Sequence, residues 1–316
     1  MVVVGGVNTD YAVRAATLPD PDHPVADGEF VQSCGGKGLN QAVAVARLGC
    51  RAALVARVGR DARGQDAVAC LEHENVASRF VSRDPDLPTG VAVIQVDRDG
   101  RKQTAAALGA NLRLTPGDID AAADAIAHAR VLLVQLEIPL ACVDRSVQIA
   151  RAHDVMVVLD PAPARPLPDR VIRGLTVIKP NASEARTLTG VEVRDVESAR
   201  AAAHELRHRG VEHVVVSAGS GTLLLSEAAE HWYDNLPVDT VDTTGAGDAF
   251  AGALAVALLE DRPLRAAVGF AHRAAAVATT VAGALPSLPN RSRVDRLVAS
   301  TQRQQKTLTG SATKTL

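Results

Sequence analysis

Short apolar runs alternate with alanine-rich segments along most of this chain of 316 residues. The apolar runs predict short buried strands at residues 2–4, 53–58, 131–135, 155–159, 176–178 and 214–217. The segments between them have helical spacing and predict helices at residues 39–48, 65–73, 119–129, 140–152 and 196–208. Strands that alternate with helices in this way predict a doubly wound α/β fold, with a mostly parallel sheet covered on both faces. In such sheets, ligands bind at the carboxyl ends of the strands.

Three segments depart from this alternation. Residues 10–33 carry several prolines and charges, and residues 90–107 alternate with period two around the turn Asp97-Arg98-Asp99-Gly100. The turn predicts a β-hairpin, and both segments predict strands outside the main sheet. Residues 161–168 carry four prolines directly after a predicted strand, which favours a stiff loop over a polyproline ligand for another domain.

Composition excludes several classes of protein. Hydrophobic residues make up 47% and charged residues 22% of the chain, and a net charge of −2 does not indicate binding to nucleic acids or membrane surfaces. The four cysteines lack CxxC spacing, so we expect free thiols in a reducing compartment. No stretch approaches the roughly 18 apolar residues of a membrane span, and no signal-peptide pattern precedes the first strand. We therefore expect a cytoplasmic protein with a disordered polar tail at residues 301–316.

The most informative stretch lies before a predicted helix at residues 250–259, where Gly245, Ala246 and Gly247 are followed by Asp248. The start of a helix leaves backbone N–H groups without partners and carries partial positive charge. Because these residues have almost no side chains, their N–H groups can surround an anionic oxygen. A carboxylate beside such an anion hole suits phosphoryl transfer to a hydroxyl. Alone, Asp248 could equally serve only to complement the helix dipole.

Two further polar patterns do not match known nucleotide-binding loops. Residues 35–38 read Gly-Gly-Lys-Gly, but a Walker A loop needs Ser or Thr after the lysine. Such close glycines let the backbone approach a small polar ligand, or simply form a tight turn. Asn8 and Asp10 follow the first strand, where a dinucleotide fold would need GxGxxG. An amide and a carboxylate there can hold adjacent hydroxyl groups, although a surface turn is the alternative.

Two sequence patterns are candidates for metal binding. Asn181 and Glu184 begin a predicted helix and match a capping box, in which each side chain bonds to the other residue's backbone. The same geometry aims their oxygens at a strand end, where they suit Mg²⁺. The HExxH pattern at residues 204–208 is not expected to bind zinc, because it lies on a charged helix with no obvious third ligand.

Three of these motifs occur in the order found in the ribokinase-like (PfkB) family of sugar kinases. The chain resembles the family motifs GGKGxNQA, NxxE and DTxGAGD at residues 35–42, 181–184 and 242–248. The resemblance, which runs from about residue 2 to about residue 289, implies an ATP-dependent kinase of ribokinase-like fold. Asp248 would be the general base, and the backbone of residues 245–247 the anion hole. It also implies that segments of about 10–33 and 89–108, inserted in a domain of residues 1–300, form a β-sheet lid that pairs with a second subunit.

The resemblance further implies ligand contacts for individual residues. Sugar contacts would fall on Asn8, Asp10, Gly36, Lys37, Gly38, Asn40, Glu137 and Asp248. Nucleotide contacts would fall on Asn181, Ser217, Gly219, Ser220, Gly221, Gly247 and His272. Magnesium would be held largely through water by Asn181 and Glu184, and potassium by Asp242, Thr244, Ala278, Val281, Gly283 and Ser287. Three of these assignments have an alternative without a ligand: a plain hairpin turn at residues 217–222, a solvated acid at Glu137 and a structural histidine at His272.

The predicted reaction is transfer of the γ-phosphoryl group of ATP to the primary 5-hydroxyl of D-ribose. The segments that look most like the ribokinase branch are residues 35–42, 109–111 and 160–164. Residues 22–25 and 102–108 depart from that branch, which leaves open another acceptor such as fructose, deoxyribose or 2-keto-3-deoxygluconate. An aromatic content of only 2% disfavours a nucleoside acceptor. A relative that only binds ligands is a further alternative, but such proteins typically lack the base or the glycines.

Overall fold

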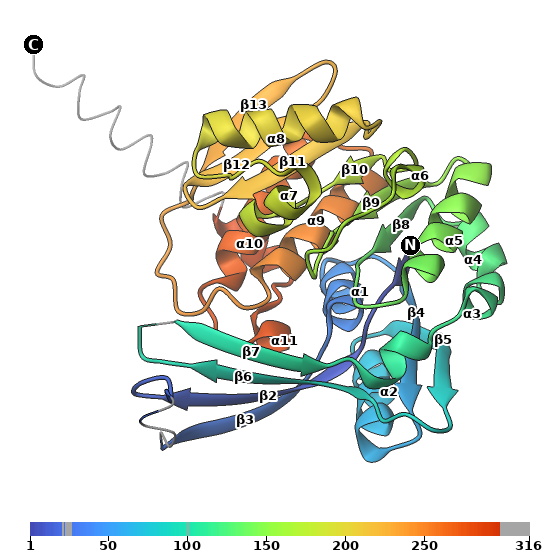
Figure 1. Cartoon of the computed structure of the whole chain (residues 1–316), viewed down its shortest axis with the longest axis vertical. Helices are drawn as coiled ribbons and strands as arrows, with labels where there is room; N and C mark the ends of the chain where they lie inside the picture. Colours follow the sequence, from blue (N-terminus) through green and yellow to red (C-terminus); the bar gives the residue numbers. More distant parts are fainter. Residues whose placement is uncertain (21, 23–26, 100, 298–316) are drawn as a thin grey trace, which may run out of the picture.

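The computed structural model describes residues 1–20, 22, 27–99 and 101–297. The expected tail at residues 301–316 and the Gly100 position of the predicted hairpin turn lie outside these residues. The described chain contains two separate sheets and confirms the predicted α/β class (Figure 1). None of the helices in this described part is long and apolar enough to cross a membrane.

The main sheet has nine strands in the order β13-β12-β11-β10-β9-β8-β1-β4-β5. Their bounds are β1 (Val2–Val4), β4 (Ala52–Gly59), β5 (Val76–Asp84), β8 (Val131–Val134), β9 (Met156–Leu159), β10 (Val177–Ile178), β11 (His213–Ala218), β12 (Gly221–Leu225) and β13 (Glu230–Asp234). All neighbours from β5 to β11 pair in parallel, whereas β12 and β13 are antiparallel. All six predicted strands lie in this sheet. The chain adds strands first on one side of β1 and then on the other, so a ligand crevice is expected between β1 and β8.

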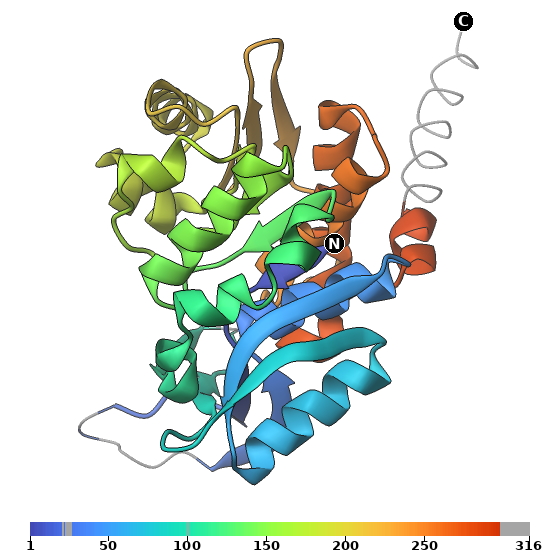
Figure 2. The ribbon, with the colours of Figure 1, turned by 90° about the vertical axis from the view of Figure 1, so that its right-hand side faces the viewer.

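Helices cover both faces of the main sheet, as predicted (Figure 2). One face is covered by α1 (Lys37–Arg47), α2 (Ala62–His73), α9 (Ala246–Leu259) and α10 (Leu264–Ala278). The other is covered by α3 (Pro116–Asp120), α4 (Ala123–Ala127), α5 (Leu140–Ala152), α6 (Asp169–Ile172), α7 (Ala182–Thr189) and α8 (Val196–His208). Successive side chains of a strand point to opposite faces. In β1, Val3 therefore packs in the first core, whereas Val2 and Val4 pack in the second.

A second, four-stranded sheet, here called the lid sheet, has the order β3-β2-β6-β7. Its strands are β2 (Asn8–Ala15), β3 (Gly28–Gly35), β6 (Gly90–Val96) and β7 (Lys102–Ala107). It extends at the lower left of Figure 1, beneath α11 (Ala284–Ser287). The expectation of strands outside the main sheet is confirmed, and β6 and β7 form the predicted antiparallel hairpin.

Sequence patterns failed in three places. The predicted helix at residues 119–129 is wrong, because the N–H of Ala122 bonds to the carbonyl of Ile119, three residues back, and the chain divides into α3 and α4. Strands β5, β12 and β13 were missed; β5 and β13 are edge strands with mixed polar sequences rather than apolar runs. Helix α9 begins at Ala246, four positions before the predicted start at Phe250.

Candidate active site

Polar residues converge at the carboxyl ends of the central strands. They follow or end five neighbouring strands, β1, β8, β9, β10 and β11, and are Asn8, Glu137, Asp160, Asn181 and Ser217. Helices α1 and α9 both begin at this edge of the sheet. The site therefore lies at the topological switch point between β1 and β8, where the fold class predicts a ligand.

The start of α9 has the geometry predicted for an anion hole, except that the expected N–H of Ala246 is already bonded within the chain. Its N-cap, Gly245, has a φ of 83°, in the left-handed region that residues with side chains seldom adopt. The N–H of Ala246 donates to the carbonyl of Thr243 at 3.3 Å, whereas the N–H groups of Gly247 and Asp248 have no acceptor among the described residues. At the positive end of a helix, these N–H groups are available to an anionic oxygen.

Asp248 is buried beside this anion hole and is oriented by α1. Its Oδ2 accepts a hydrogen bond from Nδ2 of Asn40 at 3.0 Å, and its Oδ1 accepts one from Nε2 of Gln41 at 3.0 Å. The ammonium of Lys37 lies 3.8 Å from Oδ1. Because residues three and four positions apart share one side of a helix, the motif at the start of α1 presents all three groups to one carboxylate.

A second buried carboxylate, Asp160, links the two sides of the site. It lies 3.5 Å from Nζ of Lys37 and 3.7 Å from Nζ of Lys179, and it accepts a hydrogen bond from Gln41 at 2.8 Å. Burial alone would lower the pKa of Lys37, but the negative charges of Asp160 and Asp248 outweigh it and raise that pKa. Lys37 is therefore a fixed positive charge. Neither Asp160, Lys179 nor Gln41 was predicted as a site residue.

Asn8 and Glu137 meet on the side where sugar contacts were predicted, here called the acceptor side. Nδ2 of Asn8 donates to Oε1 of Glu137 at 3.3 Å, and the backbone N–H of Lys37 donates to Oε2 at 2.7 Å. Oδ1 of Asn8 accepts from Nδ2 of Asn111 at 2.9 Å. Burial raises the pKa of Glu137 to about 7, although Lys37 acts in the opposite direction. Glu137 is thus part of a hydrogen-bonded cluster rather than a solvated loop acid.

Asp10 and Asn40 complete this side of the site. Burial, followed by the charge of Asp248, raises the pKa of Asp10 to about 6. The buried Oδ1 of Asn40 has no hydrogen-bond partner, and an unsatisfied buried acceptor is costly unless a ligand pairs with it.

The nearby Gly36 has a φ of 87°, and a Cβ there would lie 2.6 Å from the backbone nitrogen of Asn8. Close packing of the chain on itself therefore explains a glycine at position 36 without a ligand.

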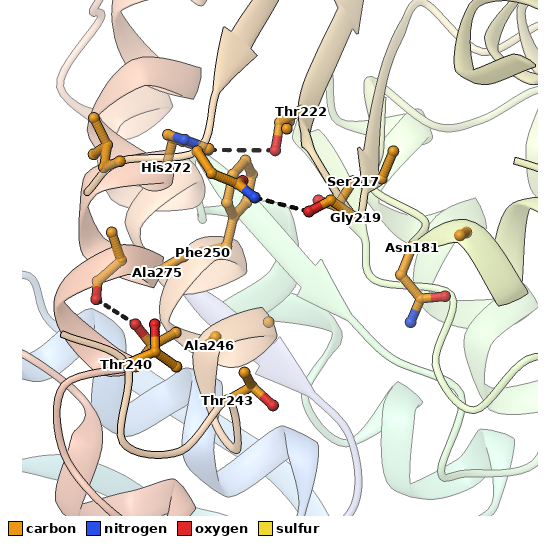
Figure 3. A pocket seen from close by; sticks show the side chains of 18 of the residues that line it. Asn181, Ser217, Gly219, Thr222, Thr240, Thr243, Ala246, Phe250, His272 and Ala275 are labelled. Carbon is orange, nitrogen blue, oxygen red and sulfur yellow. Dashed lines mark hydrogen bonds between the residues drawn. The ribbon is translucent and has the colours of Figure 1, made fainter. Parts of the chain in front are cut away.

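On the side where nucleotide contacts were predicted, here called the nucleotide side, lies a cavity of about 670 Å³ between the β11–β12 hairpin, α10 and the start of α9 (Figure 3). Six of the predicted nucleotide residues line it: Asn181, Ser217, Gly219, Gly221, Gly247 and His272. The seventh, Ser220, is exposed at the hairpin tip and does not line the cavity. Residues 217–222 are thus both a hairpin turn and a cavity wall.

His272 has structural bonds as well as a place in the cavity wall. Its Nδ1 lies 3.3 Å from Oγ1 of Thr222, and its Nε2 lies 3.0 Å from the carbonyl oxygen of Asp234. Burial lowers the pKa of His272. The ring is therefore a neutral group held between two elements, which matches the structural alternative.

Of the 21 described residues that line the cavity, the sequence predicted seven as site residues. The missed residues with the clearest place in it are Thr222, Asn235, Leu236, Val238, Thr240, Thr243, Ala275, Ala276 and Thr279. They are mostly small or singly placed residues on β12, α10 and the long connection before α9. Thr243 lies within the motif at residues 242–248 and Thr222 ends the segment 217–222, but no motif marks the others, because they contribute shape rather than a charged group.

The capping box at the start of α7 is confirmed. Oδ1 of Asn181 accepts from the N–H of Glu184 at 2.9 Å, and Oε2 of Glu184 accepts from the N–H of Asn181 at 2.8 Å. Glu184 is buried, and burial raises its pKa, followed by the charge of Asp160. Its oxygens keep further acceptor positions, which fits a magnesium ion held through water and phosphate oxygens.

The two loops expected to hold potassium lie against each other. The N–H of Gly283 donates to Oδ2 of Asp242 at 2.9 Å, and Oγ of Ser287 donates to the carbonyl of Thr244 at 3.2 Å. Ala278 and Val281 are joined by a backbone hydrogen bond in the turn after α10. The structure therefore brings the six predicted residues onto adjoining segments.

Other sequence features do not contribute to the site. His204, Glu205 and His208 are exposed on α8, as expected for a solvated helix face rather than a zinc site. Within the described ranges, no three His, Cys, Asp or Glu side chains are grouped as a metal cage. The four cysteines are free.

Comparison with known proteins identifies the family. A model of the pfkB family of carbohydrate kinases matches residues 1–291. The ribokinase of Haemophilus influenzae is 35% identical over 92% of this chain and 95% of that protein. The deoxyribokinase of Salmonella typhi is 32% identical over 92% of this chain and 95% of that protein. The structure of Arabidopsis thaliana ribokinase complexed with ribose and ATP is 31% identical, with a TM-score of 0.84 over 94% of this chain and 97% of that one.

The chain therefore belongs to the pfkB family of carbohydrate kinases. It is a ribokinase-like sugar kinase, which transfers a phosphoryl group from ATP to an alcohol group of its acceptor. The predicted family, fold class and enzyme class are confirmed.

Proposed function

We propose that this kinase phosphorylates the primary 5-hydroxyl of D-ribose, with Asp248 as general base. The observation that carries the proposal is the position of Asp248, between an anion hole on one side and a buried polar cluster with an unpaired acceptor on the other. Support for ribose comes from the relatives, because a ribokinase is among them and the related Arabidopsis enzyme was solved with ribose and ATP.

In the proposed reaction, the oxygen of the sugar's 5-hydroxyl bonds to the γ-phosphorus of ATP, and the carboxylate of Asp248 takes the proton of that hydroxyl. The bond from that phosphorus to the bridging oxygen breaks, and ADP leaves. The N–H groups of Gly247 and Asp248 stabilise the charge on the transferring group, which is worth several kcal/mol in such sites. Asn40 and Gln41 hold the carboxylate in place, and the ammonium of Lys37 lies 3.8 Å from its Oδ1.

The sugar is proposed to bind the polar cluster of Asn8, Asp10, Asn40 and Glu137 and the backbone of residues 36–38. Carboxylates accept hydrogen bonds from adjacent hydroxyls, and Oδ1 of Asn40 needs one donor to be satisfied. ATP is proposed to occupy the 670 Å³ cavity, whose size suits a nucleotide.

Magnesium is proposed to be held by Glu184 and Asn181, largely through water and the nucleotide phosphates. It would neutralise phosphate charge during transfer. The potassium site implied by the resemblance stays a prediction, because four donors already bond to the carboxylate of Asp242.

The lid sheet is proposed to cover the sugar and to pair with a second subunit. Its face opposite Asp10 exposes 60% of Phe30 and 44% of Val93, and Tyr11 stacks on Phe30. Apolar groups on an open sheet face are typical of an interface. The division into a domain of residues 1–300 with inserted lid segments, and the cytoplasmic location, also stay predictions.

Assay of ADP release across acceptors tests the substrate proposal. Ribose, 2-deoxyribose, fructose, 2-keto-3-deoxygluconate and adenosine would be compared by kcat/KM. We expect ribose to lead, and a site that bonds the 2-hydroxyl should disfavour deoxyribose by about 10-fold or more. A deoxyribokinase among the relatives makes deoxyribose the main rival. Deoxyribose turnover equal to or above that of ribose would reject the ribose assignment, and no turnover of any acceptor would favour a ligand-binding relative.

A further inference from the structure

The lid sheet contacts the turn before α9 through two basic side chains. Nη2 of Arg14, on β2, lies 2.9 Å from Oδ2 of Asp242, and Nζ of Lys102, on β7, donates to Oγ1 of Thr244 at 3.3 Å. The side chain of Asp242 is only 7% exposed, whereas that of Arg14 is 30% exposed. The lid sheet thus places a guanidinium over a buried carboxylate that belongs to the catalytic motif.

The carboxylate of Asp242 has no acceptor position left. Its Oδ1 accepts from the N–H of Thr244 at 2.8 Å and from the hydroxyl of Thr244 at 2.6 Å. Its Oδ2 accepts from Gly283 and from Arg14, each at 2.9 Å. Thr244 and Gly283 supply neutral donors, so Arg14 is the charged partner among the four donors to this buried carboxylate.

The position of this carboxylate links it to the anion hole. Residues 242–244 lead directly into Gly245, the N-cap of α9, and the carbonyl of Thr244 is bonded by Ser287. A second cavity of about 210 Å³ lies between the lid sheet and this turn, and its wall includes Asp10, Arg14, Asp242, Thr244 and Gly283. Arg14 therefore lies between the sugar-facing part of the lid sheet and the turn that positions the anion hole.

A monovalent cation and Arg14 would compete for the same oxygen. The resemblance assigns potassium to Asp242 and the loop around Gly283, but a cation at Oδ2 would have to displace the guanidinium. Two positive charges at one oxygen repel each other, so occupancy by one disfavours the other.

We propose that Arg14 supplies, from the lid sheet, the positive charge that a monovalent cation would otherwise supply at Asp242, so that turnover needs little potassium. This inference rests on the proposed function, because it gives Arg14 a role in the kinase reaction. Arg14 is a positioning residue: it does not touch the reacting atoms, and it acts by holding the turn that carries the anion hole.

Turnover of wild type and Arg14→Ala in KCl and in choline chloride of equal ionic strength tests the proposal. We expect wild-type kcat to differ by less than about twofold between the salts, whereas Arg14→Ala should lose about tenfold in choline, as typical coupling energies imply. Potassium or a low concentration of guanidinium should restore the variant. Arg101→Ala is the matched control, because Arg101 is an exposed lid-sheet arginine that pairs within its own hairpin.

Thermal unfolding in the same two salts gives a readout that needs no turnover. An ion that binds only the folded state raises Tm. Potassium should therefore raise the Tm of Arg14→Ala and leave the Tm of the wild type unchanged. This measurement can be made even if no acceptor is phosphorylated. The absence of phosphorylation would reject the proposed function but not the proposed role of Arg14. A wild-type enzyme that needs potassium as strongly as the variant would overturn the proposal, and so would a variant that neither cation restores. If Arg14→Ala does not fold, Arg14→Lys should stay independent of potassium, and a new requirement there would equally overturn it.

Discussion

The acceptor side and the nucleotide side of this site are built in different ways. On the acceptor side, charged and amide side chains from α1, β2 and the strand ends bond to one another, and most are buried. The nucleotide side is a wide cavity whose wall is largely backbone and small side chains, such as Gly219, Ala246, Gly247 and Ala275. On the proposed assignment of the two sides, side chains would specify the acceptor, whereas the nucleotide would be recognised mainly by shape and by N–H groups.

This difference predicts that substitutions on the two sides will have separate kinetic effects. Conservative changes on the acceptor side should alter catalysis or the KM for the sugar, with little effect on ATP. Changes on the nucleotide side should act only where they add bulk inside the cavity. The four predictions below run from the largest expected effect to the smallest.

Asp248→Asn should reduce kcat by roughly 10³-fold, because an amide cannot take the proton of the hydroxyl. Sugar and ATP binding should persist, since the amide has nearly the same shape. Turnover is measured by ADP release and binding by calorimetry. Asp195→Asn is the control, because Asp195 is also an acid at a helix start but caps α8 away from the site. Normal turnover in Asp248→Asn would remove the base role.

Gly247→Ala should reduce kcat by about 10–100-fold while leaving the fold intact. A Cβ at this position would lie 3.5 Å from Nζ of Lys179, an ordinary contact, but it would project a methyl group beside the anion hole. Gly252→Ala is the contrast in the same helix, because its Cβ would lie 2.7 Å from Cβ of Ala44 in the core. It should lose about 1–3 kcal/mol of stability with near-normal kcat. The opposite pattern would contradict the anion hole.

Asp10→Asn should raise the KM for ribose about tenfold, because a charged acceptor for sugar hydroxyls becomes a neutral amide. The KM for ATP should stay unchanged. Ser220→Ala is the partner variant on the nucleotide side, and it should leave both constants within about twofold, since Ser220 lies outside the cavity wall. Steady-state kinetics with each substrate varied in turn would measure both. A higher KM for ATP in Asp10→Asn would contradict the separate roles of the two sides.

Glu137 should make stability depend on pH in an unusual direction. Its pKa of about 7 in the folded protein exceeds the ordinary value of 4.5, so the folded state retains a proton that the unfolded chain releases. Stability from this group is therefore full below pH 4.5 and is lost as pH rises towards 7. Relative to Glu137→Gln, wild type should lose about 2–3 kcal/mol between pH 5 and pH 8 in urea unfolding. Parallel pH profiles of the two proteins would show that burial does not perturb Glu137.

The sequence located most of the polar cluster around Asp248 but only about a third of the cavity wall. Asn8, Asp10, Asn40 and Glu137 were all expected, because each belongs to a family motif or follows a predicted strand. Asp160 and Gln41 were not, although they bond to the same cluster. Their roles depend on which strand end faces α1, and no local pattern records that. The cavity wall on β12 and α10 was missed for the same reason.

Local chemistry is what this sequence determined by itself. Apolar runs specified six of the parallel strands, the residues near position 245 specified a turn with almost no side chains before a helix, and Asn181 with Glu184 specified a capping box, because each depends only on neighbours in the chain. Only the tertiary structure decided that Lys37 lies between Asp160 and Asp248, and that Arg14 reaches Asp242. These contacts join residues far apart in sequence, and their charges become strongly coupled only where folding removes water from between them.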